Sequence, residues 1–136
     1  MQIRSLALFL ILLALAGCTQ PPSLEAILGR EFTLTEGDEA LLEGEKLNVR
    51  FDSVVEDTRC PPNVSCVWQG NARIRLRLVK APEGERLIEL NTAQRHDPKE
   101  GGNYPAIGTY SGYRVRLLRL SSKPEYEAQL LVTKGE

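Results

Sequence analysis

The chain has 136 residues, of which 17 are Lys or Arg and 18 are Asp or Glu, so the formal net charge is −1. This balance argues against nucleic acid as a general partner, because domains that bind nucleic acid carry a clear excess of positive charge. The length fits one domain with a sizeable core, and the three cysteines suit an oxidising compartment in which two of them pair.

The N-terminal segment has the features of an export signal. Arg4 supplies a short positive region, and residues 6–16 form an apolar run that is short for a membrane span. Leu15-Ala16-Gly17-Cys18 follows and resembles the bacterial lipobox, in which the signal is cut before the cysteine and the thiol is acylated. We therefore expect residues 1–17 to be a lipoprotein signal peptide and Cys18 to carry the lipid. The alternative is an ordinary signal peptide with a coincidental cysteine.

The residue after the expected cleavage site bears on the location. Thr19 takes the second position of the mature chain, where an aspartate would resemble an inner-membrane retention signal. The sequence therefore predicts a lipid-anchored protein of the cell envelope, at the outer membrane if the cell has one and otherwise on the outer face of the cell membrane. Residues 18–23 are the expected lipidated tether, and residues 24–136 the expected single β-domain.

The first part of this domain alternates apolar and polar residues, which is typical of strands. Residues 23–29 fit either one helical turn or the lead-in to a first strand. Strands are expected over residues 31–35 and 40–43, with glycine-containing turns after each. A longer strand is expected over residues 46–55. Its apolar face carries Leu47, Val49, Phe51 and Val55.

The connection after this strand holds two cysteines around a double proline. We expect Cys60 and Cys66 to form a disulfide that staples this short loop. A zinc site would need more ligands than the chain offers, and a redox-active pair usually has Cys-x-x-Cys spacing. Asp57 and Arg59 are expected to brace the connection through hydrogen bonds.

A second long alternation begins at the second cysteine of the pair. Cys66 and Trp68 are two residues apart, so on an extended strand they share a face. Gly70 and Ala72 are small and leave room for the indole, and the glycine also suits a bulge or bend. The sequence therefore predicts that Trp68 anchors the base of the loop in the core.

The same stretch resembles a signature found in small bacterial lipoproteins of unknown function. The signature is Asp-Ser/Thr-Arg-Cys-Pro, a short gap, and then Cys-Val-Trp-x-Gly-x-Ala. Here it reads Asp57-Thr58-Arg59-Cys60-Pro61 and then Cys66-Val67-Trp68-Gln69-Gly70-Asn71-Ala72. The resemblance implies a small secreted β-domain and supplies no catalytic residues.

Arginines recur on the polar face of two predicted strands. One strand carries Arg73, Arg75 and Arg77, and a later one carries Arg114 and Arg116. If these strands are neighbours, the five guanidiniums form a basic patch suited to the phosphates of anionic lipid headgroups. The alternative is a solvated face on which the arginines pair with carboxylates. The candidate carboxylates are Glu85, Glu89, Glu125 and Glu127.

Further strands are expected over residues 86–92, 113–120 and 125–133. The alternation changes parity at Leu118, which indicates a bulge. Strands at this spacing, with turn residues between them, predict an all-β fold. We expect an antiparallel sandwich or barrel of about seven or eight strands, stapled by one disulfide, after the signal peptide.

Residues 93–112 lack a strand pattern and hold the only histidine of the chain, His96, beside Asp97. Long irregular connections in compact domains often serve function, so a hydrolytic enzyme that uses this loop is one alternative. No second histidine or free cysteine could complete a metal site, and no Gly-x-Ser-x-Gly elbow occurs. We therefore predict no catalytic residue, no metal and no cofactor.

The predicted role is non-catalytic binding or structural support in the envelope. The partners expected are the membrane, reached through the lipid on Cys18, and an envelope protein or an anionic lipid headgroup. A binding surface is expected at the apolar loop tip of Pro61, Pro62 and Val64, with the arginine face as the competing site. A protease-inhibitor-like module that uses the 60–66 loop is a further alternative.

Overall fold

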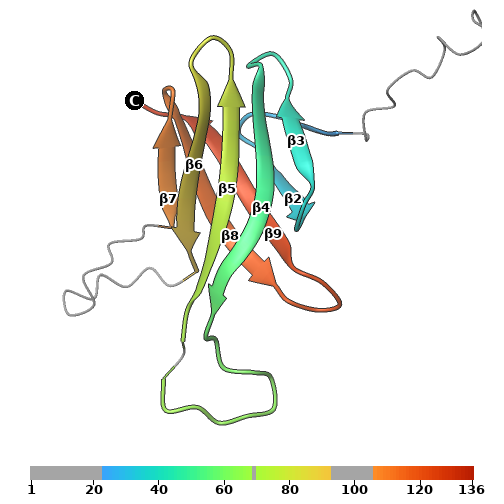
Figure 1. Ribbon diagram of the computed structural model, residues 1–136, viewed down its shortest axis with the longest axis vertical. Coiled ribbons are helices and arrows are strands. Elements are labelled where there is room, and N and C mark those ends of the chain that lie inside the picture. The colour runs from blue at the N-terminus through green and yellow to red at the C-terminus, as the bar shows by residue number, and fades with distance from the viewer. Residues whose placement is uncertain (1–22, 69, 93–105) are drawn as a thin grey trace, which may run out of the picture.

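The computed structural model describes residues 23–68, 70–92 and 106–136, which form nine strands in two sheets (Figure 1). The predicted all-β class is confirmed, and so is the disulfide between Cys60 and Cys66. The described part of the chain contains no apolar helix of membrane-spanning length.

Each sheet combines strands from both halves of the chain. The five-stranded sheet has the order β1-β3-β4-β5-β6, and the four-stranded sheet has the order β2-β9-β8-β7. All neighbouring strands are antiparallel except β1 and β3, which are parallel. The bounds in the first sheet are Leu24–Ala26 (β1), Glu39–Leu42 (β3), Leu47–Asp57 (β4), Ala72–Lys80 (β5) and Gly84–Asn91 (β6). Those in the second are Glu31–Thr35 (β2), Ile107–Tyr110 (β7), Tyr113–Ser121 (β8) and Glu127–Lys134 (β9).

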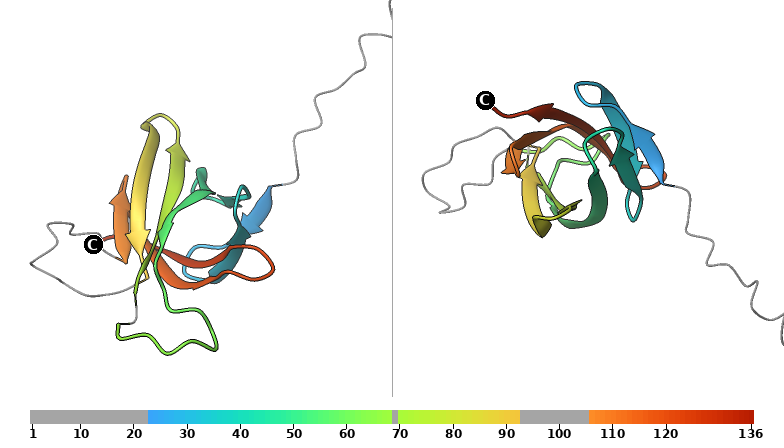
Figure 2. Two further views of the ribbon diagram at one scale, coloured as in Figure 1. Left: turned by 60° about the horizontal axis from the view of Figure 1, so that its bottom comes forward. Right: turned by 90° about the horizontal axis from the view of Figure 1, so that it is seen from above.

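The core lies between the two sheets, which face a common interior in both views of Figure 2. Period-two alternation builds this core, and β5 is the clearest case. Its residues Ala72, Ile74, Leu76 and Leu78 are fully buried, whereas the residues between them are partly exposed. Each fully buried leucine contributes about 1.5–3 kcal/mol. The described core residues all fall between positions 26 and 132, after the expected signal peptide.

Bulges in β4 and β8 change which residues face the core. The register of β8 shifts at Leu118, which bears out the predicted bulge. The register of β4 shifts after Phe51, and Val54 rather than Val55 then packs against the core. The prediction for Val55 was wrong because one extra residue reverses the alternation that follows it.

Two added strands account for the difference between the nine observed and the seven or eight predicted, and one predicted strand starts later than expected. Residues 24–26 form β1, so the alternative of a first strand is confirmed and the alternative of a helical turn is wrong. β7 lies inside the segment 93–112, for which the sequence predicts an irregular connection. Residues 93–105 of this segment fall outside the described residues. β5 begins at Ala72, six residues later than the alternation from Cys66 predicted.

Candidate functional site

The connection between β4 and β5, residues 58–71, projects past the strand ends at the bottom of Figure 1. We call it the disulfide loop. Its base is closed by hydrogen bonds that continue the pairing of the two strands. The Thr58 N–H donates to the Asn71 carbonyl oxygen over 2.8 Å, and the Asn71 N–H donates to the Thr58 hydroxyl oxygen over 3.1 Å. The chain therefore leaves and re-enters the sheet at one fixed point.

Gly70 is the residue that lets the two ends of the loop meet. It has a φ of +65°, a left-handed conformation that side chains rarely adopt. A Cβ at this position would lie 1.9 Å from the Thr58 carbonyl oxygen, far inside van der Waals contact. Only glycine fits this position without displacing the backbone of the other end.

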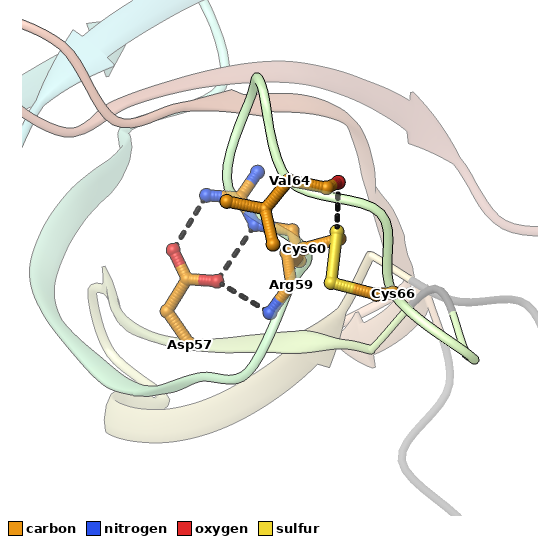
Figure 3. Close-up of a disulfide and its surroundings, with 5 residues drawn as sticks. All are labelled: Asp57, Arg59, Cys60, Val64 and Cys66. Atoms are coloured by element: carbon orange, nitrogen blue, oxygen red, sulfur yellow. Dashed lines mark hydrogen bonds and ion pairs between the residues drawn. A yellow bond between two sulfur atoms is a disulfide. The ribbon is translucent and has the colours of Figure 1, made fainter.

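Asp57 and Arg59 form a bidentate ion pair beside the disulfide (Figure 3). These are the two residues predicted to brace the connection. The Arg59 Nε donates to Asp57 Oδ1 over 2.8 Å, and Nη2 donates to Oδ2 over 2.6 Å. These bonds lower the pKa of the Asp57 carboxyl and raise the pKa of the Arg59 guanidinium.

The same pair connects the disulfide loop to the opposite sheet. The Arg59 Nη1 donates to the Leu120 carbonyl oxygen on β8 over 2.6 Å. The Tyr126 hydroxyl, just before β9, donates to Asp57 Oδ2 over 3.2 Å. Because these contacts join residues more than 60 positions apart, they fix the direction in which the loop leaves the sandwich.

A turn and the disulfide define the tip of the loop. The Val64 N–H donates to the Pro61 carbonyl oxygen over 3.3 Å, and Asn63 has a φ of 78°. Proline followed by asparagine is the pair that a type II turn favours at its two central positions. The Cys60–Cys66 bond then crosslinks both sides of the turn, with the Cα atoms 5.9 Å apart. The Cys60 Sγ also lies 3.0 Å from the Val64 carbonyl oxygen, which is a close contact because a disulfide sulfur has no hydrogen to donate.

This fixed loop exposes large apolar side chains to solvent. The exposed fraction is 57% for Val64, 99% for Val67 and 78% for Trp68. The prediction that Trp68 anchors the loop in the core was therefore wrong. The left-handed conformation of Gly70 interrupts the extended backbone, so the parity of β5 does not continue back to Trp68. Pro61 and Pro62 are exposed as well, so the apolar surface covers the turn and the segment after it.

The three arginines of β5 are neutralised on the outer face of their sheet. Their ion pairs are Arg75–Glu89 at 2.8 Å, Arg77–Asp52 and Arg77–Glu85 at 2.9 Å, and Arg73–Glu56 at 3.5 Å. Two of the predicted partners, Glu85 and Glu89, are among them. β8, with Arg114 and Arg116, belongs to the other sheet, so the five guanidiniums do not form one patch. On β5 the ion pairs match the alternative of a solvated face, because carboxylates on β4 and β6 balance the arginines. Binding through these arginines stays a prediction.

A second polar cluster, at the other end of the sandwich, had no signal in the sequence. The Tyr113 hydroxyl donates to the Glu45 carboxylate, and the Lys134 Nζ lies 3.2 Å from Glu45 Oε1. The Lys80 Nζ lies 5.9 Å from the centre of the Tyr113 ring. The bond to Glu45 raises the pKa of Tyr113 to about 12, which disfavours the phenolate that a nucleophile or base would need. This cluster therefore joins the β3–β4 turn of one sheet to β8 and β9 of the other.

Two shallow hollows lie on the surface of the described residues. One of about 330 Å³ is lined by residues 41–44 and Lys46 in the β3–β4 turn. Another of about 320 Å³ lies over the second sheet and is lined by Thr33, Arg119, Ser121, Lys123, Glu127 and Gln129. Within the described ranges, no three His, Cys, Asp or Glu side chains converge on a point that could hold a metal ion. The most distinctive feature of the described surface is the apolar side of the disulfide loop.

Two predicted features, the lipidated Cys18 and the His96 segment, lie outside the described residues. Comparison with protein-family models, with curated proteins and with solved structures found no match for this chain.

Proposed function

We propose that this chain is a lipid-anchored protein of the cell envelope whose β-domain binds another envelope protein, without catalysis, through the disulfide loop. The observation that carries the proposal is the exposure of Val67 and Trp68, with exposed fractions of 99% and 78%. Both lie on a loop that hydrogen bonds at its base and a disulfide hold in place. Exposed apolar side chains that a fold holds in place mark interaction sites more often than scattered ones do.

The rigidity of the loop supports binding. Hydrogen bonds close its base, Arg59 ties it to β8, and a turn and a disulfide shape its tip. Ordering a flexible side chain or loop upon binding costs about 0.5–1.5 kcal/mol per immobilised side chain, and here the backbone is ordered beforehand. Tryptophan is also the residue type most often found at the energetic centre of an interface.

The chemistry of the loop indicates the kind of partner. From Cys60 to Asn71 the chain has no charged side chain, and the nearest charges, Asp57 and Arg59, pair with each other. An apolar recess on a protein complements such a surface, whereas a charged ligand does not. The expected tether of residues 18–23 spans about 20 Å when extended, so a lipid on Cys18 would keep the partner close to the membrane.

Site-specific crosslinking in the living cell tests this proposal. A photo-crosslinking amino acid replaces Val67 in the full chain, and in a parallel strain it replaces Leu87, an exposed residue on β6 with an exposed fraction of 49%. We expect one discrete protein adduct from position 67, and none from position 87. Mass spectrometry of the same material identifies the adduct and checks acylation of Cys18.

A second variant separates the loop from the rest of the surface. Adding Trp68→Ala to the position-67 strain should remove most of the adduct, because the indole supplies the largest exposed apolar area of the loop. The same adducts from positions 67 and 87, or an adduct that persists without the indole, would contradict the assignment of the binding site.

A further inference from the structure

Three arginines lie on the outer face of β8. Arg114, Arg116 and Arg119 are exposed, and among the described residues none of them contacts a carboxylate. This is the opposite of β5, where each arginine has an acidic neighbour on an adjacent strand. In the described part of the chain, three arginines without an ion pair therefore lie together on the four-stranded sheet.

The bulge at Leu118 is what places all three arginines on one face. Arg114 and Arg116 alternate with the buried residues Val115 and Leu117, so they point outward. Strict alternation would then turn Arg119 inward. The extra residue shifts the register, and Arg119 comes to lie opposite Gln129 on the outer face.

The neighbours of this row leave the guanidiniums accessible. In β7 and β9, Arg114 lies opposite Thr109 and Thr133, and Arg116 lies opposite Ile107 and Leu131. Two carboxylates on this face, Glu31 and Glu127, accept hydrogen bonds from neutral side chains and form no ion pair with the three arginines. Glu31 accepts a hydrogen bond from Gln129 over 2.7 Å, and Glu127 accepts one from Ser121 over 3.4 Å. Lys123 and Arg119 together line the shallow hollow at the far end of the row.

We propose that this outer face of β8 docks on the anionic phospholipid headgroups of a membrane. A guanidinium binds phosphate oxygens through two parallel hydrogen bonds. The arginines follow a strand, with Arg114 and Arg116 about 7 Å apart, so they present a line of donors and not a pocket that would enclose one soluble phosphate. Leu118, with an exposed fraction of 37%, adds an apolar contact between Arg116 and Arg119 that a lipid surface can accommodate.

This docking would orient the domain that the lipid only tethers. A lipid on Cys18 would hold only the end of the tether, whereas a basic surface on the domain would set the orientation of the domain at an anionic membrane. The β8 face and the disulfide loop use different residues, so the inference stands apart from the proposed protein partner. Failure of one leaves the other intact.

Vesicle binding of the chain without its lipid tests the β8 face alone. Residues 19–136 contain every described core residue and would be mixed with vesicles of phosphatidylcholine, with or without phosphatidylglycerol. We expect cosedimentation only with the phosphatidylglycerol vesicles, weakening as salt is added. Replacing Arg114, Arg116 and Arg119 with Gln should weaken binding on the order of 100-fold, and Arg116→Gln alone several-fold.

A charge-matched control distinguishes the β8 face from net charge. Lys46, Arg50 and Arg86 are exposed and lie on the five-stranded sheet or in its β3–β4 turn, so replacing all three with Gln removes the same charge away from this face. The inference predicts nearly unchanged binding for this control. Equal losses in both triple variants, or equal binding to neutral vesicles, would overturn it. Displacement of the domain from vesicles by inorganic phosphate, at an ionic strength at which sodium chloride leaves it bound, would assign the row to soluble phosphate instead.

Discussion

At the scale of single residues, Gly70 decides whether the disulfide loop can close. Alanine in a left-handed conformation costs about 1–2 kcal/mol. At Gly70 the added Cβ would also lie 1.9 Å from the Thr58 carbonyl oxygen, so the base of the loop must open. We therefore expect Gly70→Ala to lower the free energy of unfolding by more than the conformational cost alone, measured by urea denaturation.

Gly44 provides the matched control for this change. It has a φ of +78° and nothing within 4 Å of the place that its Cβ would occupy. Gly44→Ala therefore carries only the conformational cost. Equal effects of the two substitutions would mean that the close approach at Thr58 does not shape the loop.

Alanine substitutions at Trp68 and Leu76 test which of these side chains belongs to the core. Trp68 has an exposed fraction of 78%, whereas Leu76 is fully buried. We expect Trp68→Ala to change the free energy of unfolding by less than about 0.5 kcal/mol. Leu76→Ala should cost about 2–5 kcal/mol, because it leaves a cavity between the sheets. A large loss of stability in Trp68→Ala would restore the role of core anchor and remove the indole from the candidate binding site.

At the scale of elements, alternation in the sequence predicts the strands that have one buried face. β2, β5, β8 and β9 each alternate in this way, and all four could be identified from the sequence. β7 has only four residues and includes a glycine packed against Ile88, so its pattern is too short to stand out. A strand of this length is recognisable only from its pairing with β8.

The candidate site shows the limit of the same reasoning. The turn chemistry of the loop tip, its disulfide and the Asp57–Arg59 pair are local, and each could be inferred from neighbouring residues. The exposure of Trp68 could not, because it depends on one backbone conformation at Gly70. The contacts of Arg59 with Leu120 and of Glu45 with Tyr113 join residues 61 and 68 positions apart, and no local pattern marks such pairs.

At the scale of the whole molecule, polar ties join the two sheets at both ends of the sandwich. One is the bond from Arg59 to Leu120 beside the disulfide loop, and the other is the Tyr113–Glu45–Lys134 cluster. Each tie includes a carboxyl whose pKa is lowered by its hydrogen bonds, Asp57 in the first and Glu45 in the second. The packing of the sheets is therefore linked to pH through these carboxyls.

The cluster around Tyr113 links stability to pH on both the acid and the alkaline side. Because the pKa of Glu45 is lowered from 4.5, its contribution is present above pH 4.5 and is lost as the pH falls through the folded-state pKa. Because the pKa of Tyr113 is raised from 10.0 to about 12, its contribution is present below pH 10 and is lost as the pH rises toward 12. Tyr113→Phe removes the shared hydrogen bond. It therefore removes the dependence at Tyr113 and the part of the dependence at Glu45 that this bond causes, while Lys134 continues to lower the pKa of Glu45.

We therefore expect the original chain to exceed the Tyr113→Phe variant in stability by a constant amount between pH 4.5 and 10, and by less on either side of this range. Urea unfolding midpoints measured across the pH range test this. Glu25→Gln serves as the control, because Glu25 is exposed on β1 and has no ion pair in the described part of the chain. Its midpoints should follow those of the original chain at every pH. If the Tyr113→Phe curve also ran parallel to the original from acid to alkali, the bond to Glu45 would not link the two sheets, and the packing of the sandwich would rest on its apolar core and on the tie at Arg59.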